Sequence, residues 1–404
     1  MSIARPCAGS AETLTLADCI KRAIAVAPAI DAAAAAFEAS HADLDEARAP
    51  LRPALHSAIE YNQAPGYDER ISNRGLSSGQ LVADYIAFDG GRRLAQLHAA
   101  RYAAQAAALG VDAARSQIIR DTKVAYFDLL RARETESELR SNFDRLGRFA
   151  AIVKALVASG RAIAEDRLKI DVARDQAEIA LAKSRHARQR SSILLGSFIG
   201  AYGQDDIAIA DAPAPALPLA QDLSRNPIMQ ALQKHVTAAR SEIDAAHAER
   251  YPTFKIELTT GFVGVDPQQT IDHRGGASYD GLFSLPLFDG GAIHSHIDRA
   301  MAHEHQARAA VRETELELSR RLAEAGSRYR EAHDSLQLLA RTLPTADDAF
   351  ELGWARFLGG GHVTILEVLD AYNQSRQLRL DRLDQEFAAR QAAAEAEQIL
   401  SVND

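Results

Sequence analysis

The chain has 404 residues and a net charge of −9, with 25% charged and only 6% aromatic residues. The acidic balance argues against nucleic acid as a partner, because binding the phosphate backbone requires clustered positive charge. Two cysteines, Cys7 and Cys19, are too few for a disulfide framework, and the abundance of alanine and charged residues favours long helices over a thick globular core.

The N-terminal part of the chain predicts a helix followed by two strands. Residues 14–49 have a helical composition, Pro28 restarts the helix, and Pro50 ends it. Apolar and polar residues then alternate over about 54–62 and about 80–88, which indicates two half-exposed strands. The segment between them is rich in glycine and polar residues and predicts a long loop.

A very long helix is predicted next, from about residue 91 to 157. Its apolar residues recur at spacings of three and four, as in a coiled-coil seam; they are Leu139, Phe143, Leu146, Ala150, Val153 and Val157. Ser159 and Gly160 break this helix, and a second helix is predicted over about 164–195. Such helices have no core of their own, so they must bury their apolar stripe against other helices.

The second half of the chain repeats this order at an offset of about 200 residues. The repeated elements are a helix beginning near Pro227, strands over about 253–263 and 278–288, a long helix over about 292–357, a glycine break at Gly359–Gly361 and a last helix over about 364–400. The sequence therefore predicts one duplicated architecture. Its first repeat spans residues 12–200, its linker 201–222 and its second repeat 223–400.

One phrase, Phe-Asp-Gly-Gly, occurs once in each half, between a predicted strand and a long helix. We call residues 88–91 the first junction and residues 288–291 the second junction; they are Phe88, Asp89, Gly90 and Gly91, and Phe288, Asp289, Gly290 and Gly291. An Asp at this place suits the N-cap of a helix, and the paired glycines permit a turn that a Cβ would hinder. The phrase lacks the Lys-Ser/Thr of a phosphate-binding loop, so we expect a structural joint.

The sequence contains no run of about 18 apolar residues, the length of a membrane-spanning helix. Amphipathic strands remain possible membrane segments, and Phe88 and Phe288 would suit an aromatic girdle. Four strands are too few to close a barrel, and an open sheet edge in lipid leaves backbone groups unpaired. The membrane interpretation therefore requires several chains, and its alternative is a pair of hairpins packed on a soluble helical core.

The duplicated helix–strand–loop–strand–helix order, the paired Phe-Asp-Gly-Gly junctions and the paired glycine breaks resemble the TolC family of bacterial outer-membrane efflux and type I secretion channels. The resemblance covers about residues 12–400. It implies a mostly α-helical homotrimer whose chains each add four strands to a twelve-stranded β-barrel. It also implies a helical tunnel of about 100 Å through the periplasm.

The same resemblance implies partners: outer-membrane lipid, a periplasmic adaptor protein and an inner-membrane transporter. It implies a passive exit duct with no cofactor and no catalysis, and no catalytic motif is found in the sequence. The transported substrate stays open between drugs, metals and secreted proteins. The alternative function is a soluble coiled-coil scaffold, since the N-terminus predicts neither a signal peptide nor a lipidated Cys7.

The glycine breaks correspond to the family's periplasmic helix tips, where the adaptor would dock. The expected docking residues are Gly160, Arg161, Gly360, Gly361 and His362. By the same resemblance, Glu367, Asp370 and Asp166 fall where the family places the acidic residues of its periplasmic constriction. The sequence departs from the family at Val363, where a basic gate residue is expected, and Arg161 is the candidate substitute.

A histidine-rich stripe follows the second junction. His294, Asp298, Met301 and His305 recur at positions i, i+4, i+7 and i+11 of the predicted helix, with His296 and His303 nearby. Such side chains can bind metals, so the stripe is a candidate metal site. The spacing matches no established metal motif, and a polar, histidine-rich helix surface is the interpretation that we prefer.

Overall fold

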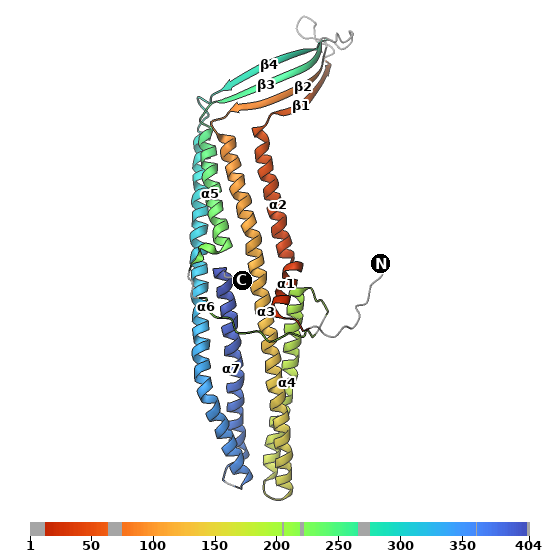
Figure 1. Ribbon diagram of the computed structural model, residues 1–404, viewed down its shortest axis with the longest axis vertical. Helices are drawn as coiled ribbons and strands as arrows, with labels where there is room; N and C mark the ends of the chain where they lie inside the picture. Colours follow the sequence, from red (N-terminus) through yellow and green to blue (C-terminus); the bar gives the residue numbers. More distant parts are fainter. Residues whose placement is uncertain are drawn as a thin grey trace, which may run out of the picture. The chain divides into compact units, whose positions relative to one another are not determined.

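A computed structural model of the chain describes residues 13–63, 75–203, 206–218, 222–265, 275–360 and 362–401. The chain divides into two units. The helical unit contains residues 1–31, 112–226 and 315–404, and the sheet unit contains residues 32–111 and 227–314. Figure 1 shows the elements of both.

The predicted order of elements is confirmed. The helices are α1 (Leu16–Val26), α2 (Pro28–Arg48), α3 (Arg92–Ala158), α4 (Ala164–Ile199), α5 (Pro227–Ala248), α6 (Ala292–Leu358) and α7 (Ile365–Leu400), with short 3-10 turns η1 (Ala49–Leu51) and η2 (Leu223–Arg225). The strands are β1 (Ala54–Gln63), β2 (Gly75–Phe88), β3 (Thr253–Val265) and β4 (Gly276–Ser284). Helices α3 and α6 each have 67 residues and α4 and α7 each have 36, as expected of a duplication.

In the sheet unit the four strands form one antiparallel sheet in the order β1-β2-β3-β4. Leu55 lies opposite Ala83, Ala83 opposite Leu258, and Leu258 opposite Tyr279, so one row crosses all four strands. A register shift between Ile86 and Phe88 then brings Phe88 opposite Phe254 at the end of β2. Because successive side chains alternate between faces, these residues define one apolar face.

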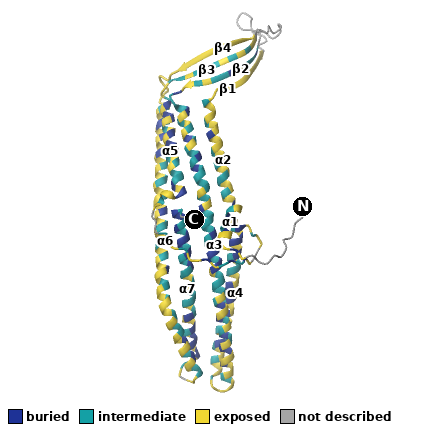
Figure 2. Cartoon of the chain, viewed as in Figure 1, coloured by how far each residue is buried: buried dark blue, intermediate teal, exposed yellow. Residues whose placement is uncertain are grey.

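The apolar face is exposed. Ile59 is 86% exposed and Tyr279 81% exposed, and Figure 2 shows the strands largely as exposed or intermediate. The opposite face carries charge: Asp84, Glu257 and Asp280 lie opposite one another on neighbouring strands. The ammonium of Lys255 lies 3.4 Å from Asp84 and 3.1 Å from Glu257, which offsets the repulsion between like charges.

The fourth strand is shorter than predicted. Alternation over 278–288 suggested a strand that reaches the second junction, but β4 ends at Ser284. Pro286 has no N–H for the ladder, and β4 is an edge strand with a neighbour on one side only. The second strand is longer than predicted: β2 begins at Gly75 and not near residue 80, because residues 75–79 pair with β1. The rest of the two predicted loops falls on 64–74 and 266–274, outside the described residues.

In the helical unit, α3 and α4 form one hairpin, and α6 and α7 form another (Figure 1). One core cluster contains Tyr126, Phe127, Leu195 and Cys19. The Tyr126 hydroxyl donates to the Ala210 carbonyl at 2.5 Å and lies 3.3 Å from the Leu14 carbonyl, and burial raises the pKa of Tyr126 to about 12. The core thereby holds the start of α1 against the segment between the two halves.

A second core cluster lies between α3, α4, α6 and α7 of the same unit. The rings of Phe149 and Trp354, the only tryptophan of the chain, have centroids 4.5 Å apart, and those of Phe350 and Tyr372 lie 5.1 Å apart. Pro344 lies inside α6, and Asp144 occupies the corresponding place in α3. The two hairpins therefore differ in the one residue that removes a helical hydrogen bond.

Among the described residues no single helix is long and apolar enough to cross a membrane. One bent pair, α1 with Pro28–Leu51, meets the length and composition requirement across an angle of 47°.

Candidate functional site

The first junction contains one buried carboxylate, that of Asp89, and both of its oxygens accept hydrogen bonds. Asp89 accepts hydrogen bonds from the Gly91 and Arg93 backbone N–H groups at 3.1 and 3.0 Å, as an N-cap does. Gly90 and Gly91 have φ angles of +68° and +89°, which glycine adopts without strain. Asp89 lies two residues before the N-cap position, which Gly91 occupies, and its side chain accepts from the first turn of α3 from there.

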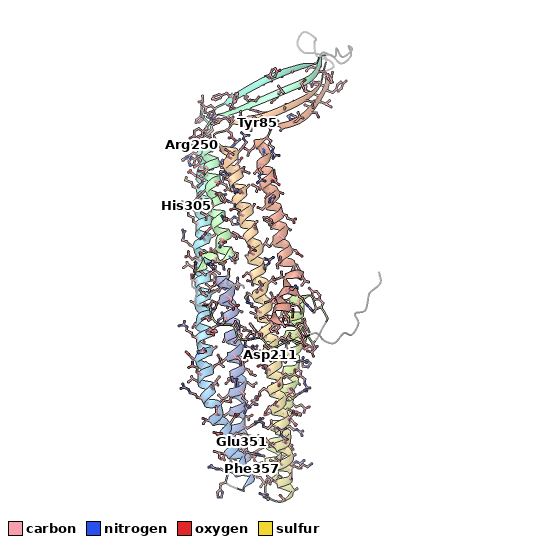
Figure 3. The ribbon with its side chains drawn as sticks, viewed as in Figure 1. Tyr85, Asp211, Arg250, His305, Glu351 and Phe357 are labelled. Carbon is pink, nitrogen blue, oxygen red and sulfur yellow. The ribbon has the colours of Figure 1, made fainter. Side chains whose placement is uncertain are left out.

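Arg93 extends this joint to two other segments. Its guanidinium donates to the Asp89 carboxylate at 2.8 Å and to the carbonyls of Pro50 and Ile86, each at 2.5 Å. It also lies 5.8 Å from the centre of the Tyr85 ring, which is labelled in Figure 3. Arg93 thus connects the end of the α2–η1 segment, the end of β2 and the start of α3.

The carboxyl group of Asp89 is only slightly exposed. Burial by itself would raise its pKa, but the side-chain and backbone hydrogen bonds from Arg93 and the guanidinium charge outweigh burial. The pKa of Asp89 is consequently held below its ordinary value.

The second junction has the same backbone but different surroundings. Asp289 accepts from the N–H groups of Gly291 and Ile293 at 2.9 and 2.6 Å, and Gly290 and Gly291 have φ angles of +68° and +91°. Phe288 is 92% exposed. Ile293 stands where the first half has Arg93, so this position supplies no guanidinium to the second junction.

The two junctions also differ in their neighbours within the sheet unit. A Cβ added to Gly90 would lie 2.6 Å from the Tyr251 Cβ and 2.9 Å from the Ala248 carbonyl oxygen. A Cβ added to Gly290 would meet no described atom within 4 Å. The first junction therefore packs against the corner between α5 and β3, whereas the corresponding surface of the second junction is uncovered.

The expected docking residues lie at the two hairpin turns of the helical unit. Gly160 and Gly360 have φ angles of +72° and +79°, so both turns require glycine. Arg161 donates to the Leu358 carbonyl at 2.9 Å and thereby links the two turns. His362 is exposed, and Gly361 lies outside the described residues.

Of the three expected constriction residues, Asp166 and Glu367 lie in the first turns of α4 and α7, and Asp370 lies in the next turn of α7. Glu367 forms a capping box with Thr364: its carboxylate accepts from the Thr364 N–H, and the Thr364 hydroxyl accepts from the Glu367 N–H, both at 3.3 Å. Asp166 accepts from the Ile163 N–H at 3.3 Å, and Asp370 accepts from Gln374 at 3.0 Å. All three carboxylates thus have local partners, and Glu367 and Asp370 are exposed.

The departure at Val363 has a structural explanation. Val363 is partly buried and packs against the aromatic cluster of Phe149, Trp354 and Tyr372. An arginine there would have to leave this apolar contact, so the link between the turns comes from Arg161 instead. The aromatic cluster was missed in the sequence, although Phe350 and Trp354 at spacing i, i+4 gave a signal for it.

The side chains of the candidate metal stripe do not come together around one point. His294 lies 3.5 Å from Asp298 on the exposed surface of α6, and Met301 and His305 are exposed as well (His305 is labelled in Figure 3). Within the described part of the chain, no three His, Cys, Asp or Glu side chains are placed to hold one metal ion together.

Comparison with known proteins matches the amino-acid sequence of the chain to one family. The model of the outer membrane efflux protein family matches residues 19–201 and again residues 219–401. Because the same model matches both halves, the chain is an internal duplication.

Individual relatives match over most of their length. The cobalt-zinc-cadmium resistance protein CzcC of Cupriavidus metallidurans is 27% identical over 92% of this chain and 86% of its own length. The outer membrane protein TolC of Escherichia coli is 24% identical over 87% of this chain and 76% of its own. A crystal structure of CusC shares the fold with a TM-score of 0.86 at 17% identity, covering 95% of this chain and 91% of that one.

The junctions, the paired hairpin turns and the duplicated family match lead to the same conclusion. The chain belongs to the outer membrane efflux protein family and is an outer-membrane efflux channel protein of tripartite pumps.

Proposed function

We propose that three copies of this chain form a passive exit duct, in which twelve strands close a barrel in outer-membrane lipid and the helices form a periplasmic tunnel. The observation that carries the proposal is the four-stranded sheet with one exposed apolar face and one charged face. An apolar outer face suits lipid, and a charged inner face suits a water-filled passage. Lipid cannot satisfy the backbone of the outer edges of β1 and β4, so copies must pair edge to edge.

The duplication indicates how neighbouring copies would meet. Tyr251 and Ala248, which cover the first junction, correspond to Arg52 and Ala49 at the offset of 199 that relates Pro252 to Pro53. In a closed ring the uncovered second junction of one copy would pack against the Ala49–Arg52 corner of the next. The repeats joined in this way would span residues 12–200 and 223–400, with 201–222 as linker.

This arrangement is tested with the variants Gly90→Ala and Gly290→Ala. Both place a Cβ at a φ of +68°, so their intrinsic strain is equal. Among the residues that the structure describes, Gly90 has close neighbours and Gly290 has none within 4 Å. If copies cover the second junction, both variants lower the yield of trimer in detergent, measured by light scattering after size-exclusion chromatography. A monomeric wild-type chain, or a trimer that does not conduct K⁺ in planar bilayers, would contradict the proposal.

We further propose that the hairpin turns are the periplasmic gate and the adaptor-docking site. Threefold symmetry would make Glu367 and Asp370 two rings of three carboxylates, a device for attracting cations. Asp166 would stabilise the turn between α3 and α4, where its carboxylate accepts from the Ile163 N–H. The bond from Arg161 to the Leu358 carbonyl supports a role for Arg161 in holding the two hairpins of one chain together.

The adaptor would contact the exposed turn residues Gly160, Arg161, Gly360, Gly361 and His362, and the adaptor would join the duct to an inner-membrane transporter. Divalent metals are a candidate cargo, because one relative is a cobalt-zinc-cadmium resistance protein. Drugs and secreted proteins are the alternative cargoes, which transport assays with the cognate pump would separate.

A further inference from the structure

A groove of about 660 Å³ crosses the helices of the sheet unit, apart from the junctions and the hairpin turns. Alanines of α3, α5 and α6 form its apolar lining, and the polar side chains are contributed mainly by α5 and α6. Three histidines line it: His235, His296 and His303. Three carboxylates, those of Asp43, Glu242 and Glu249, line it against one guanidinium, that of Arg299, so its charge favours cations.

The histidines and glutamates follow a common register between α5 and α6. The Nδ1 atom of His296 lies 2.9 Å from the Glu249 carboxylate, and the Arg240 guanidinium lies 3.1 Å from Glu304. From the first pair to the second, the residue number falls by nine on α5 and rises by eight on α6, so the two helices are antiparallel. One heptad further along each helix, the same register places His303 at the level of Glu242, and both residues line the same groove.

We propose that this groove binds divalent transition-metal cations, such as Zn²⁺ and Co²⁺, at successive His–Glu pairs. The pairs are Glu249 with His296 and Glu242 with His303, about 10 Å apart along the helices. An imidazole and a carboxylate suit borderline cations, whereas Mg²⁺ prefers oxygen ligands alone. Each pair supplies two protein ligands, and water completes the coordination.

Two ligands per site suit passage better than storage. Among the described residues no three such side chains converge, so no site here has the closed ligand set of a structural metal. Conduction requires sites that attract an ion and release it again. The role of the groove in passage rests on the proposed duct, in which this hollow, lined by α2, α3, α5 and α6, would face the channel interior.

The test uses the purified full chain, stripped of metal, titrated with Zn²⁺, Co²⁺ and Mg²⁺ by calorimetry. The groove variant is His296→Gln with His303→Gln. The matched control is His294→Gln with His305→Gln, which removes two exposed histidines from the same helix outside the groove. Glu242→Gln is a second groove variant at an exposed position, which removes a ligand with no buried contact to disturb.

The expected result is weak Zn²⁺ and Co²⁺ binding that falls at least about tenfold in the groove variants and is unchanged in the control. Binding that is lost in the control and kept in the groove variants would place the site on the exposed stripe and overturn the proposal. Absence of binding, or equal affinity for Mg²⁺, would also overturn it.

Planar-bilayer currents separate this inference from the proposed duct. If both hold, K⁺ passes through the wild type, added Zn²⁺ reduces that current, and the groove variant conducts K⁺ without the Zn²⁺ effect. A K⁺ current that Zn²⁺ does not change in the wild type would overturn the inference and leave the duct intact. Lack of any K⁺ current would overturn the duct and with it the role of the groove in passage, and calorimetry would then decide the binding alone.

Discussion

Asp89, just before α3, and Arg93, in the first turn of α3, form a buried ion pair at 2.8 Å. The same position in the second half is Ile293, so Asp289 caps its helix with backbone donors alone. Two junctions with the same motif and nearly equal backbone angles are thus held by different interactions.

This difference predicts unequal responses to the same substitution. At each junction both carboxylate oxygens accept a backbone N–H, and Asn keeps only one of these two acceptors. Asp→Asn therefore removes one backbone bond at both junctions, and only Asp89→Asn also removes an ion pair. We expect Asp89→Asn to lower the free energy of unfolding by about 2 kcal/mol, since it removes a charge-assisted bond to a buried guanidinium. Asp289→Asn should have a clearly smaller effect. Denaturant unfolding in detergent measures both, and equal effects would contradict the distinct role of Arg93.

The ion pair also predicts a dependence on pH. Because the pKa of Asp89 is lowered in the folded chain, its contribution to stability is present above the unfolded-state value of about 3.9 and is lost as pH falls below it. The stability difference between wild type and Asp89→Asn should therefore be largest near pH 7 and should shrink from about pH 4 downward. A difference that stays constant between pH 7 and pH 3 would show that the carboxylate charge is not responsible.

Arg161 is predicted to restrain the hairpin turns. Arg161→Gln removes a hydrogen bond of about 1 kcal/mol between the two turns, so the open-channel frequency in bilayers should rise roughly fivefold. The emission of Trp354, which lies in the cluster beneath these turns, should shift with it. Arg167→Gln is the control, because Arg167 pairs with Asp171 on its own helix and with no other described residue; an equal rise in that variant would refute the restraint.

Glu367 and Asp370 are predicted to set ion selectivity. Glu367→Gln keeps the capping box, since glutamine also serves at this position, and it removes only the charge. The ratio of K⁺ to Cl⁻ permeability, from the reversal potential in a salt gradient, should fall in Glu367→Gln and in Asp370→Asn. Glu351→Gln is the control at an exposed position of α6, labelled in Figure 3. Unchanged selectivity in both tip variants would exclude the acidic rings.

Much of the fold could be predicted from the sequence because the signals are local. Proline positions, period-two alternation and heptad spacing each depend on a few neighbouring residues, and they placed most element boundaries within a few residues. The end of β4 was missed because it depends on Pro286 and on an edge without a second neighbour. The apolar face of the sheet was likewise readable from alternation, whereas the covered and uncovered junctions became visible only from packing.

The site residues were harder to predict from the sequence, because their partners come from distant parts of the chain. Arg93 gives no local signal, because its carbonyl partners, Pro50 and Ile86, come from other elements. The stripe of His294 and His305 was visible at helical spacing, but the histidines that line a groove are the adjacent His296 and His303, and only the register with α5 distinguishes them. The capping box of Thr364 and Glu367 could have been read from the sequence, since the Thr-x-x-Glu pattern is local.

Pro344 creates a point at which α6 can bend, because proline has no backbone N–H to complete the helical hydrogen bond. The helix continues for 14 residues beyond it, from Pro344 to Leu358, which is an arm of roughly 20 Å. A change of about 10° in the direction of the helix axis at Pro344 would move the end of α6 sideways by roughly 3–4 Å. This movement is enough to break the bond between Arg161 and the Leu358 carbonyl. In the hairpin of α3 and α4, Asp144 occupies the corresponding place, and α3 continues through it as one helix. This hairpin can therefore stay fixed while the end of α6 moves.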